Sequence, residues 1–194
     1  MVSKKVLATI GLGLVFGETT LVLLSWILSA AGVEGVRSLL STEGVRWFFG
    51  NFTQMVGAPP LVWLLVLLIA FGCLQQSGLL SMQKSFRDRL ALRVAVVLLV
   101  AYVGIILLLT VVPHAILLSA TGHLFPSAFS RSLVPILAFG VMLVSIAFGM
   151  MSGRMPTAVQ VLDALSYGLV QGAPFIVLYI LAAQLCHSLA FVFL

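Results

Sequence analysis

The sequence predicts an all-α integral membrane protein with about five transmembrane helices, arranged as an inverted repeat with interfacial helices. Of its 194 residues, 62% are hydrophobic and only 8% are charged, whereas soluble domains average about 45–50% apolar and about 25% charged residues. Lipid restricts spanning structures to helices and closed barrels, because every backbone polar group needs an internal partner. Barrel strands alternate apolar and polar residues, and the run AVVLLVAYVGIILLLTVV (95–112) does not alternate. The composition therefore predicts a helical bundle.

Five segments are long enough to cross a membrane, since a spanning helix needs about 20 apolar residues. They lie within residues 6–32, 58–80, 94–112, 133–153 and 167–193. Near its start the chain has two lysines followed by an apolar run, as a signal peptide does. No small-residue cleavage pattern follows Phe16, so we interpret the segment as a retained first helix. Glu18 either marks a buried polar position in this helix or shows that the span begins near Thr19, and we favour the second interpretation.

The distribution of basic residues predicts the orientation, because cytoplasmic loops of membrane proteins carry an excess of Lys and Arg. With the N-terminus in the cytoplasm, the inner side has seven bases and the outer side three. We therefore expect a protein of the inner (cytoplasmic) membrane, with the N-terminus cytoplasmic and the C-terminus outside. The inner bases are Lys4, Lys5, Lys84, Arg87, Arg89, Arg93 and Arg154, and the outer ones are Arg37, Arg46 and Arg131.

The tripeptide Gly-Ala-Pro begins both span two (57–59) and span five (172–174). A less apolar segment with one apolar helical face precedes each copy, at 41–55 and 154–168, which is typical of a helix lying in the membrane interface. One span lies between the copies and reverses the second. We expect a single transmembrane domain, 1–194, with repeat one at about 6–82, a connector helix at about 90–114 and repeat two at about 131–194. The alternative is chance recurrence, because proline is favoured at helix starts.

Two stretches of the chain are similar to the aminobenzoyl-glutamate transporter (AbgT) family. Residues 39–80 resemble the first-repeat signature, and residues 148–193 resemble the matching part of the second repeat. The first resemblance depends on Leu39–Ser41, Glu43, Gly44, Arg46, Asn51, Phe52, Pro60, Leu61 and Ser77–Leu79, and the second on Phe148, Gly149, Ser152, Gly153 and Ala182–Leu185.

The resemblance implies ion-coupled secondary transport of aminobenzoyl-glutamate or related aromatic folate-type compounds, and pairing as dimers. Family members are longer, and they carry re-entrant hairpins whose tips are thought to hold substrate and ion. The resemblance therefore indicates a short form that lacks the hairpin regions.

Polar residues near the ends of two spans are the candidate substrate-binding group. Unpaired buried amides are costly in lipid, so these residues either form hydrogen bonds between helices, which we favour, or hold a substrate. His187 follows Gln184 by three residues and is expected to share its face, whereas Asp163 and Arg154 are expected to face water. The candidates are Gln75, Gln76, Ser77, Gln184 and His187.

No catalytic or metal-binding pattern is evident. His114, His123 and His187 are isolated, and Cys73 and Cys186 lie in apolar runs, where cysteine behaves as a small hydrophobe. The sequence predicts no enzyme, no metal and no cofactor.

Two functions stay open: a transporter of small aromatic anions, and a non-transporting scaffold or accessory subunit that binds another membrane protein. The expected partners are the lipid bilayer and a homodimer mate or other membrane protein. We expect no nucleic acid, because the net charge of +5 is explained by topology.

Overall fold

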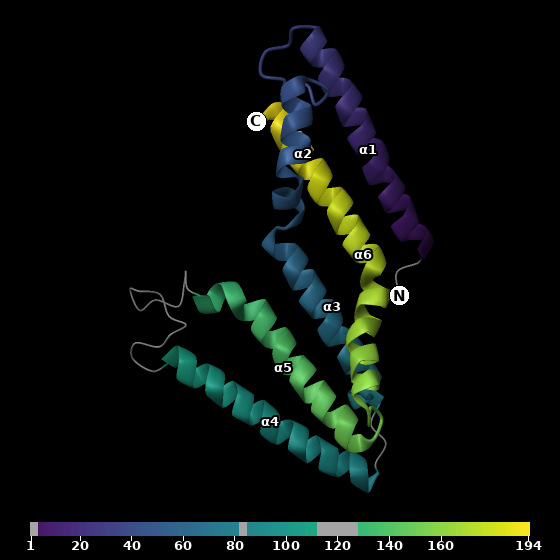
Figure 1. The fold of residues 1–194 in the computed structure, drawn as a ribbon, viewed down its shortest axis with the longest axis vertical. Helices are drawn as coiled ribbons and strands as arrows, with labels where there is room; N and C mark the ends of the chain where they lie inside the picture. Colours follow the sequence, from purple (N-terminus) through teal and green to yellow (C-terminus); the bar gives the residue numbers. More distant parts are fainter. Residues whose placement is uncertain (1–3, 82–84, 112–127) are drawn as a thin grey trace. The chain divides into compact units, whose positions relative to one another are not determined.

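The computed structural model describes residues 4–81, 85–111 and 128–194, and these ranges are helical apart from short connections (Figure 1). They contain no strand, which confirms the predicted all-α class. Lys84, His114 and His123 lie outside the described residues. The helices are α1 (Lys4–Ala30), α2 (Thr42–Val56), α3 (Pro59–Ser77), the 3₁₀ turn η1 (Leu79–Ser81), α4 (Phe86–Val111), α5 (Ala128–Ser152) and α6 (Ala158–Phe193).

Five helical segments of the described ranges are long and apolar enough to cross a membrane, as the sequence predicts. They are Lys4–Ala30, Pro59–Ser81, Phe86–Thr110, Ser132–Ser152 and Ala158–Phe193. These spans identify the chain as an integral membrane protein. The inverted repeat and its boundaries stay a prediction.

Helix α2 is a separate amphipathic helix of 15 residues. At about 1.5 Å per residue it is roughly 22 Å long, which is less than the roughly 30 Å of a bilayer's hydrocarbon core. The hydroxyl of Ser41 accepts a hydrogen bond of 3.0 Å from the backbone N–H of Gly44 and caps the helix start. Gly57 ends the helix, and its N–H bonds to the carbonyl of Thr53 at 2.8 Å. The length and the apolar face suit the interfacial helix expected over 41–55.

The second expected interfacial helix is not separate, because α6 runs without interruption from Ala158 to Phe193. The two Gly-Ala-Pro copies differ in what surrounds them. Pro59 is followed by Pro60, and two prolines suit the start of a helix, where the missing N–H groups have no partner to lose. Pro174 is single and lies inside α6, where the helix continues past it. The boundary expected near residue 168 is therefore wrong.

The described helices form two compact units, and each is treated by itself. The first, which we call the α1 unit, comprises residues 1–62 and 173–194. Here α1 lies along the C-terminal part of α6 (Figure 1). Leu21, Leu39, Phe191 and Val192 form its core. The ring of Trp47 stacks on that of Phe191 with centroids 4.2 Å apart, which attaches α2 to this core.

The second unit, which we call the α4–α5 unit, comprises residues 63–172. Helices α4 and α5 lie side by side in it (Figure 1), and Ala91, Ala95 and Phe148 are fully buried between them. Helices α3 and α6 approach at Gly72 and Gly168, where a Cβ on Gly168 would lie 1.8 Å from the carbonyl oxygen of Leu68. Glycine permits this backbone contact, as in other membrane helix pairs.

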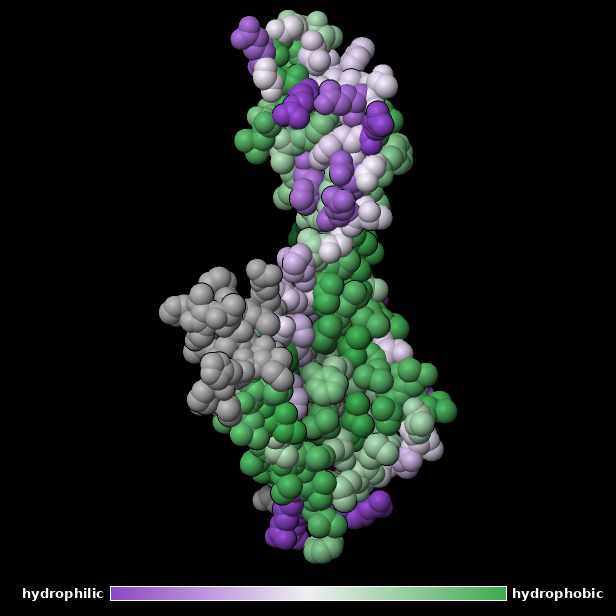
Figure 2. All heavy atoms as spheres, turned by 60° about the vertical axis from the view of Figure 1, so that its left-hand side comes forward, coloured by the Kyte–Doolittle hydropathy of each residue, from purple (hydrophilic) through white to green (hydrophobic). Residues whose placement is uncertain are grey.

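The surface of the α4–α5 unit is apolar over its length. Figure 2 shows hydrophobic residues over most of the visible part of this unit, and hydrophilic residues gathered at the end where α4 begins. A soluble protein rarely exposes a continuous apolar surface of this kind, so the exposed side of α4 suits contact with lipid. That side includes Val96, Val97, Val100, Leu107 and Leu108.

Candidate functional site

An acidic side chain lies in the middle of the first spanning helix. Glu18 follows Lys4 by 14 residues and precedes Ala30 by 12 within α1. The favoured interpretation, that the span begins near Thr19, is therefore wrong. The hydroxyls of Thr19 and Thr20 bond to the carbonyls of Val15 and Phe16 one turn earlier, so the helix continues through this polar stretch.

Glu18 is joined to α6 through two buried polar side chains. The hydroxyl of Ser188 donates a hydrogen bond of 2.7 Å to Glu18 Oε1, and Gln184 Nε2 lies 3.5 Å from the same hydroxyl. Ser188 is fully buried and Gln184 is 8% exposed. Two buried oxygens, Glu18 Oε2 and Gln184 Oε1, have no hydrogen-bond partner among the described residues. We call these three residues the Glu18 group.

The face of α6 that carries this group differs from the one expected. Gln184 and Ser188 are four residues apart and therefore lie one above the other on a helix. Their side chains are buried, while His187 and Cys186 are exposed. His187 thus does not share the buried position of Gln184. Sequence reasoning passed over Ser188, although its spacing of one helical turn from Gln184 was a usable signal.

A second polar arrangement lies in the α4–α5 unit, at the C-terminal end of α3. The guanidinium of Arg154 donates to the carbonyl oxygens of Ser77, at 3.3 Å, and of Gly78. It also pairs with the carboxylate of Asp88 at 3.2 Å. The last carbonyls of a helix have no partner within it, so Arg154 supplies a donor to the Ser77 carbonyl, whereas the Gly78 carbonyl also accepts from the N–H of Ser81 at 3.1 Å. Its side chain is 27% exposed, which corrects the expectation that it simply faces water.

Ser77 has a local structural role in this arrangement. Its fully buried hydroxyl donates to the carbonyl of Leu74 at 2.9 Å and accepts from the N–H of Leu79 at 3.3 Å. Gly78 follows with a φ of 69°, a left-handed conformation that glycine adopts without steric cost. These contacts hold the turn against which the Arg154 guanidinium lies.

A polar pocket of about 230 Å³ adjoins Arg154. We call it the Gln76 pocket. It contains a guanidinium, a carboxylate and two amides, so it offers both hydrogen-bond donors and acceptors. Gln75, the neighbour of Gln76, is exposed and does not line it. The lining residues are Gln76, Arg154, Met155, Gln160, Asp163 and Ala164.

The predicted substrate-binding residues therefore fall into two groups. Gln75, Gln76 and Ser77 belong to the α4–α5 unit, and of these Gln76 lines the pocket. Gln184 and His187 belong to the α1 unit, where Gln184 joins the Glu18 group.

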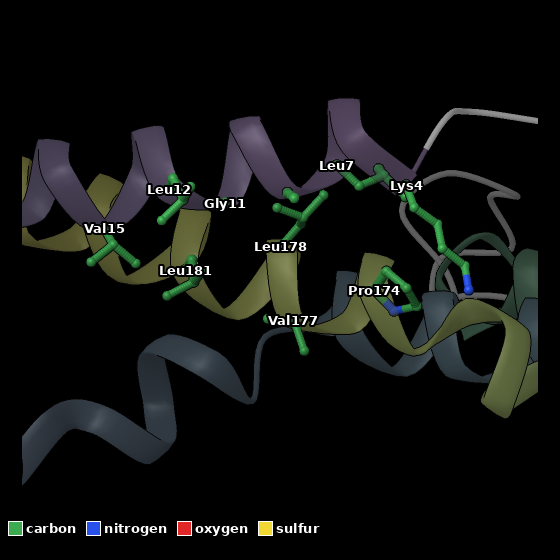
Figure 3. A pocket seen from close by; sticks show the side chains of 10 residues that line it. Lys4, Leu7, Gly11, Leu12, Val15, Pro174, Val177, Leu178 and Leu181 are labelled. Carbon is green, nitrogen blue, oxygen red and sulfur yellow. The ribbon is translucent and has the colours of Figure 1, made fainter.

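An apolar groove of about 470 Å³ lies between α1 and α6 in the α1 unit (Figure 3). Leu7, Leu12 and Val15 of α1 and Leu178 and Leu181 of α6 contribute to its walls. Lys4 provides the charged group of the lining. Sites for polar ligands contain several placed polar groups, so this groove is a poorer candidate than the Gln76 pocket.

Metal ligands are not clustered in the part of the chain that the structure describes: it contains no group of three or more His, Cys, Asp or Glu side chains. Cys73 and Cys186 are free thiols, the first buried and the second exposed. The side chains of the two polar arrangements can form hydrogen bonds and ion pairs and can exchange protons.

The five candidate spanning helices define the class of a polytopic membrane protein. The family model of the AbgT putative transporter family matches residues 83–192, which is 110 of the 194 residues. The chain belongs to this family. No curated protein and no solved structure matches the chain significantly.

The matched range includes α4, α5 and nearly all of α6, with Arg154, Asp163, Gln184 and Ser188. Glu18 and Gln76 precede it. Of the two stretches that carry the resemblance in the sequence, the second lies almost wholly within the matched range and the first lies before it.

Proposed function

We propose that this chain takes part in the secondary transport of aminobenzoyl-glutamate or related aromatic folate-type compounds across the inner (cytoplasmic) membrane. The observation that carries the proposal is the family match over residues 83–192. The spanning helices support it, because a protein that moves a solute across a bilayer must itself cross the bilayer. A soluble binding protein does not need such helices. The proposal excludes an enzymatic role for the chain.

The chemistry of the Gln76 pocket supports a substrate with mixed polar groups. Aminobenzoyl-glutamate has an aromatic amine, an amide and two carboxylates. Arg154 is suited to a carboxylate, and Asp163 to an amine or amide N–H. Gln76 and Gln160 can serve either kind of group, since an amide both donates and accepts.

The size of the Gln76 pocket limits how much of such a compound it holds. Its volume of about 230 Å³ is below the range of about 300–1,000 Å³ typical of small-molecule sites. We therefore propose that it binds one polar end of the substrate. Among the other candidate substrate-binding residues, Ser77 would act by positioning Arg154. Gln75, Gln184 and His187 stay candidates, although they do not line the Gln76 pocket.

Uptake into liposomes tests this function. Purified protein reconstituted without other proteins should accumulate labelled aminobenzoyl-glutamate above the level of empty vesicles. Gln76→Leu should reduce uptake at least several-fold, because it replaces a pocket amide by an apolar side chain of similar size. The matched control is Gln54→Leu on α2, a surface glutamine remote in sequence from the pocket, which should leave uptake unchanged. Flux equal to that of empty vesicles contradicts transport by this chain.

An accessory membrane subunit is the second candidate function. The observation in its favour is the smallness of the Gln76 pocket, which is consistent with a site completed by another chain. Size measurement in mild detergent, together with pull-down, would then find a stable complex with a second copy or another membrane protein. A transporting monomer argues against this candidate.

A further inference from the structure

The Glu18 group places a half-buried carboxylate, with its Oε2 atom buried, inside a spanning helix, and this carboxylate has no part in the proposed function. We propose that Glu18 binds and releases a proton within the membrane, and that Gln184 and Ser188 form the site that holds the protonated acid. This inference deepens the proposed transport function by naming the coupling ion, and its use in transport depends on that function. Proton binding itself is measurable without transport.

The first argument is the arrangement of open hydrogen-bond positions. Glu18 Oε2 and Gln184 Oε1 are buried and without partners among the described residues, and both atoms are acceptors when the acid is ionised. Two acceptors cannot satisfy each other. In the proposed site, one proton on Glu18 Oε2 makes that oxygen a donor, and Gln184 Oε1 is its acceptor. Both residues contact the Ser188 hydroxyl, and a single proton would supply the bond that both open oxygens lack.

The remaining bonds of the group are compatible with either state. Ser188 donates to Glu18 Oε1 at 2.7 Å, and a carboxyl oxygen accepts this bond whether the acid is ionised or not. The amide nitrogen of Gln184 lies 3.5 Å from the Ser188 hydroxyl. Gln184 is thus oriented with its nitrogen toward Ser188, and its oxygen stays available. Proton binding forms one O–H bond on Glu18, and release returns that proton to water.

The second argument is the absence of a counter-charge. An acid inside a membrane span is costly when ionised and is a functional site by default. In the described part of the α1 unit, no cation forms an ion pair or hydrogen bond with Glu18. Tyr179 on α6 is half-buried, nine residues before Ser188. The other titratable or charged side chains are exposed, namely Lys4, Lys5, Glu34, Arg37, Glu43, Arg46, Cys186 and His187.

The third argument separates a proton from a metal cation. Sodium sites in transporters draw on backbone carbonyls freed where spanning helices are broken. Helix α1 is continuous around Glu18, and α6 is continuous around Gln184 and Ser188. The carbonyls nearest the group are thus committed to helix hydrogen bonds. Four side-chain oxygens without free carbonyls suit a proton better than a sodium ion.

Infrared difference spectroscopy of the purified protein tests the proposal directly. A change of pH at constant sodium should produce the carbonyl stretch of a protonated carboxylic acid, and Glu18→Gln should remove this band. Glu43→Gln, which changes an exposed acid on α2, is the matched control and should leave the band unchanged. Identical difference spectra for the wild type and Glu18→Gln overturn the proposal. A band that follows sodium at constant pH also overturns it, in favour of a metal cation.

Folding of the variants provides a second readout. Glutamine at position 18 has an amide N–H that can replace the proposed O–H, so Glu18→Gln should keep a Tm at or above that of the wild type. Glu18→Ala, which leaves Gln184 Oε1 open, should lower it. If Glu18→Gln fails to fold, Gln184→Met keeps the test decisive. Loss of the hydrogen bond should then move the Glu18 band to higher frequency, and an unmoved band contradicts the role of Gln184.

Transport measurements distinguish this proposal from the function on which it rests. Wild-type uptake should increase several-fold with an inward proton gradient, and Glu18→Gln should lose that increase. The infrared band without any uptake supports the proton site and contradicts the proposed function. Uptake that is the same with and without a proton gradient, in a protein that lacks the infrared band, supports the function and overturns the proton site.

Discussion

The guanidinium of Arg154 lies 3.2 Å from the carboxylate of Asp88, and it also donates to the carbonyls of Ser77, the last residue of α3, and of Gly78. Arg154→Gln should lower the free energy of unfolding in detergent by roughly 2–4 kcal/mol, because removal of one partner from a fully buried pair costs about 3–5 kcal/mol and this pair is partly exposed. Arg154→Lys should lose less, since it keeps the charge but not the planar fork of donors.

The matched control for this prediction is Arg46→Gln on the exposed face of α2. An isolated surface charge contributes within about 0.5 kcal/mol, so its unfolding curve in denaturant should coincide with that of the wild type. Equal losses for both variants would contradict the role of Arg154 at the end of α3.

The glycine contact between α3 and α6 predicts a sharp difference between two glycine substitutions. Gly168→Ala should be strongly destabilising, because its Cβ would lie 1.8 Å from the carbonyl oxygen of Leu68 and backbone cannot yield as a flexible side chain does. Overpacking costs about 1–3 kcal/mol or more.

Gly104→Ala on α4 is the matched control: its Cβ would meet nothing within 4 Å. It should be neutral or stabilising by up to about 1 kcal/mol, owing to helix propensity. Thermal unfolding in detergent compares the two.

The spans could be predicted from sequence because length and apolar composition alone decide whether a helix crosses a bilayer. The partners of polar side chains could not. The sequence alone favours a helix boundary near Glu18, since an isolated acid in an apolar run has no visible partner. That partner, Ser188, is 170 residues away. The same limit applied to Arg154 and Asp88, which are separated by 66 residues.

The second Gly-Ala-Pro shows a different limit. Pro59 and Pro174 occur in the same tripeptide, yet one begins a helix and the other lies inside one. The difference depends on Pro60 and on the capping geometry of Gly57. A short motif thus predicts where a chain can turn. The surrounding hydrogen bonds decide whether it does.

The pairing of α4 with α5 depends in part on one tyrosine. The hydroxyl of Tyr102 donates a hydrogen bond of 2.8 Å to the carbonyl of Ile136. Hydrogen bonds between membrane helices average about 0.6 kcal/mol, with a maximum of about 1.7 kcal/mol. Tyr102→Phe should therefore lower stability by roughly 0.5–1.5 kcal/mol and leave the fold intact, as judged by circular dichroism and denaturant titration.

A second substitution at the same contact separates the hydroxyl from the ring. A Cβ on Gly140 would lie 2.9 Å from Cε1 of Tyr102, and a stiff ring must move as a whole to make room. Gly140→Ala should thus cost at least as much as Tyr102→Phe. If both variants unfold at the same denaturant concentration as the wild type, the α4–α5 contact does not depend on this tyrosine.

The orientation in the membrane is the last prediction, and it follows from the cations near the ends of the spans. Arg87, Arg89 and Arg154 lie near the start of α4 and the turn before α6, so they share one membrane side if each spanning helix crosses once. The positive-inside rule assigns that side to the cytoplasm. Five crossings then place the two termini on opposite sides, with the N-terminus inside.

A reporter active only outside the cytoplasm should function after Leu194 and fail before Met1. Replacement of the arginines at 87, 89 and 93 by glutamine should reduce this preference, because the charge difference between the sides falls. A reporter after Leu194 that functions only in the cytoplasm contradicts the orientation, whatever the arginine variants do.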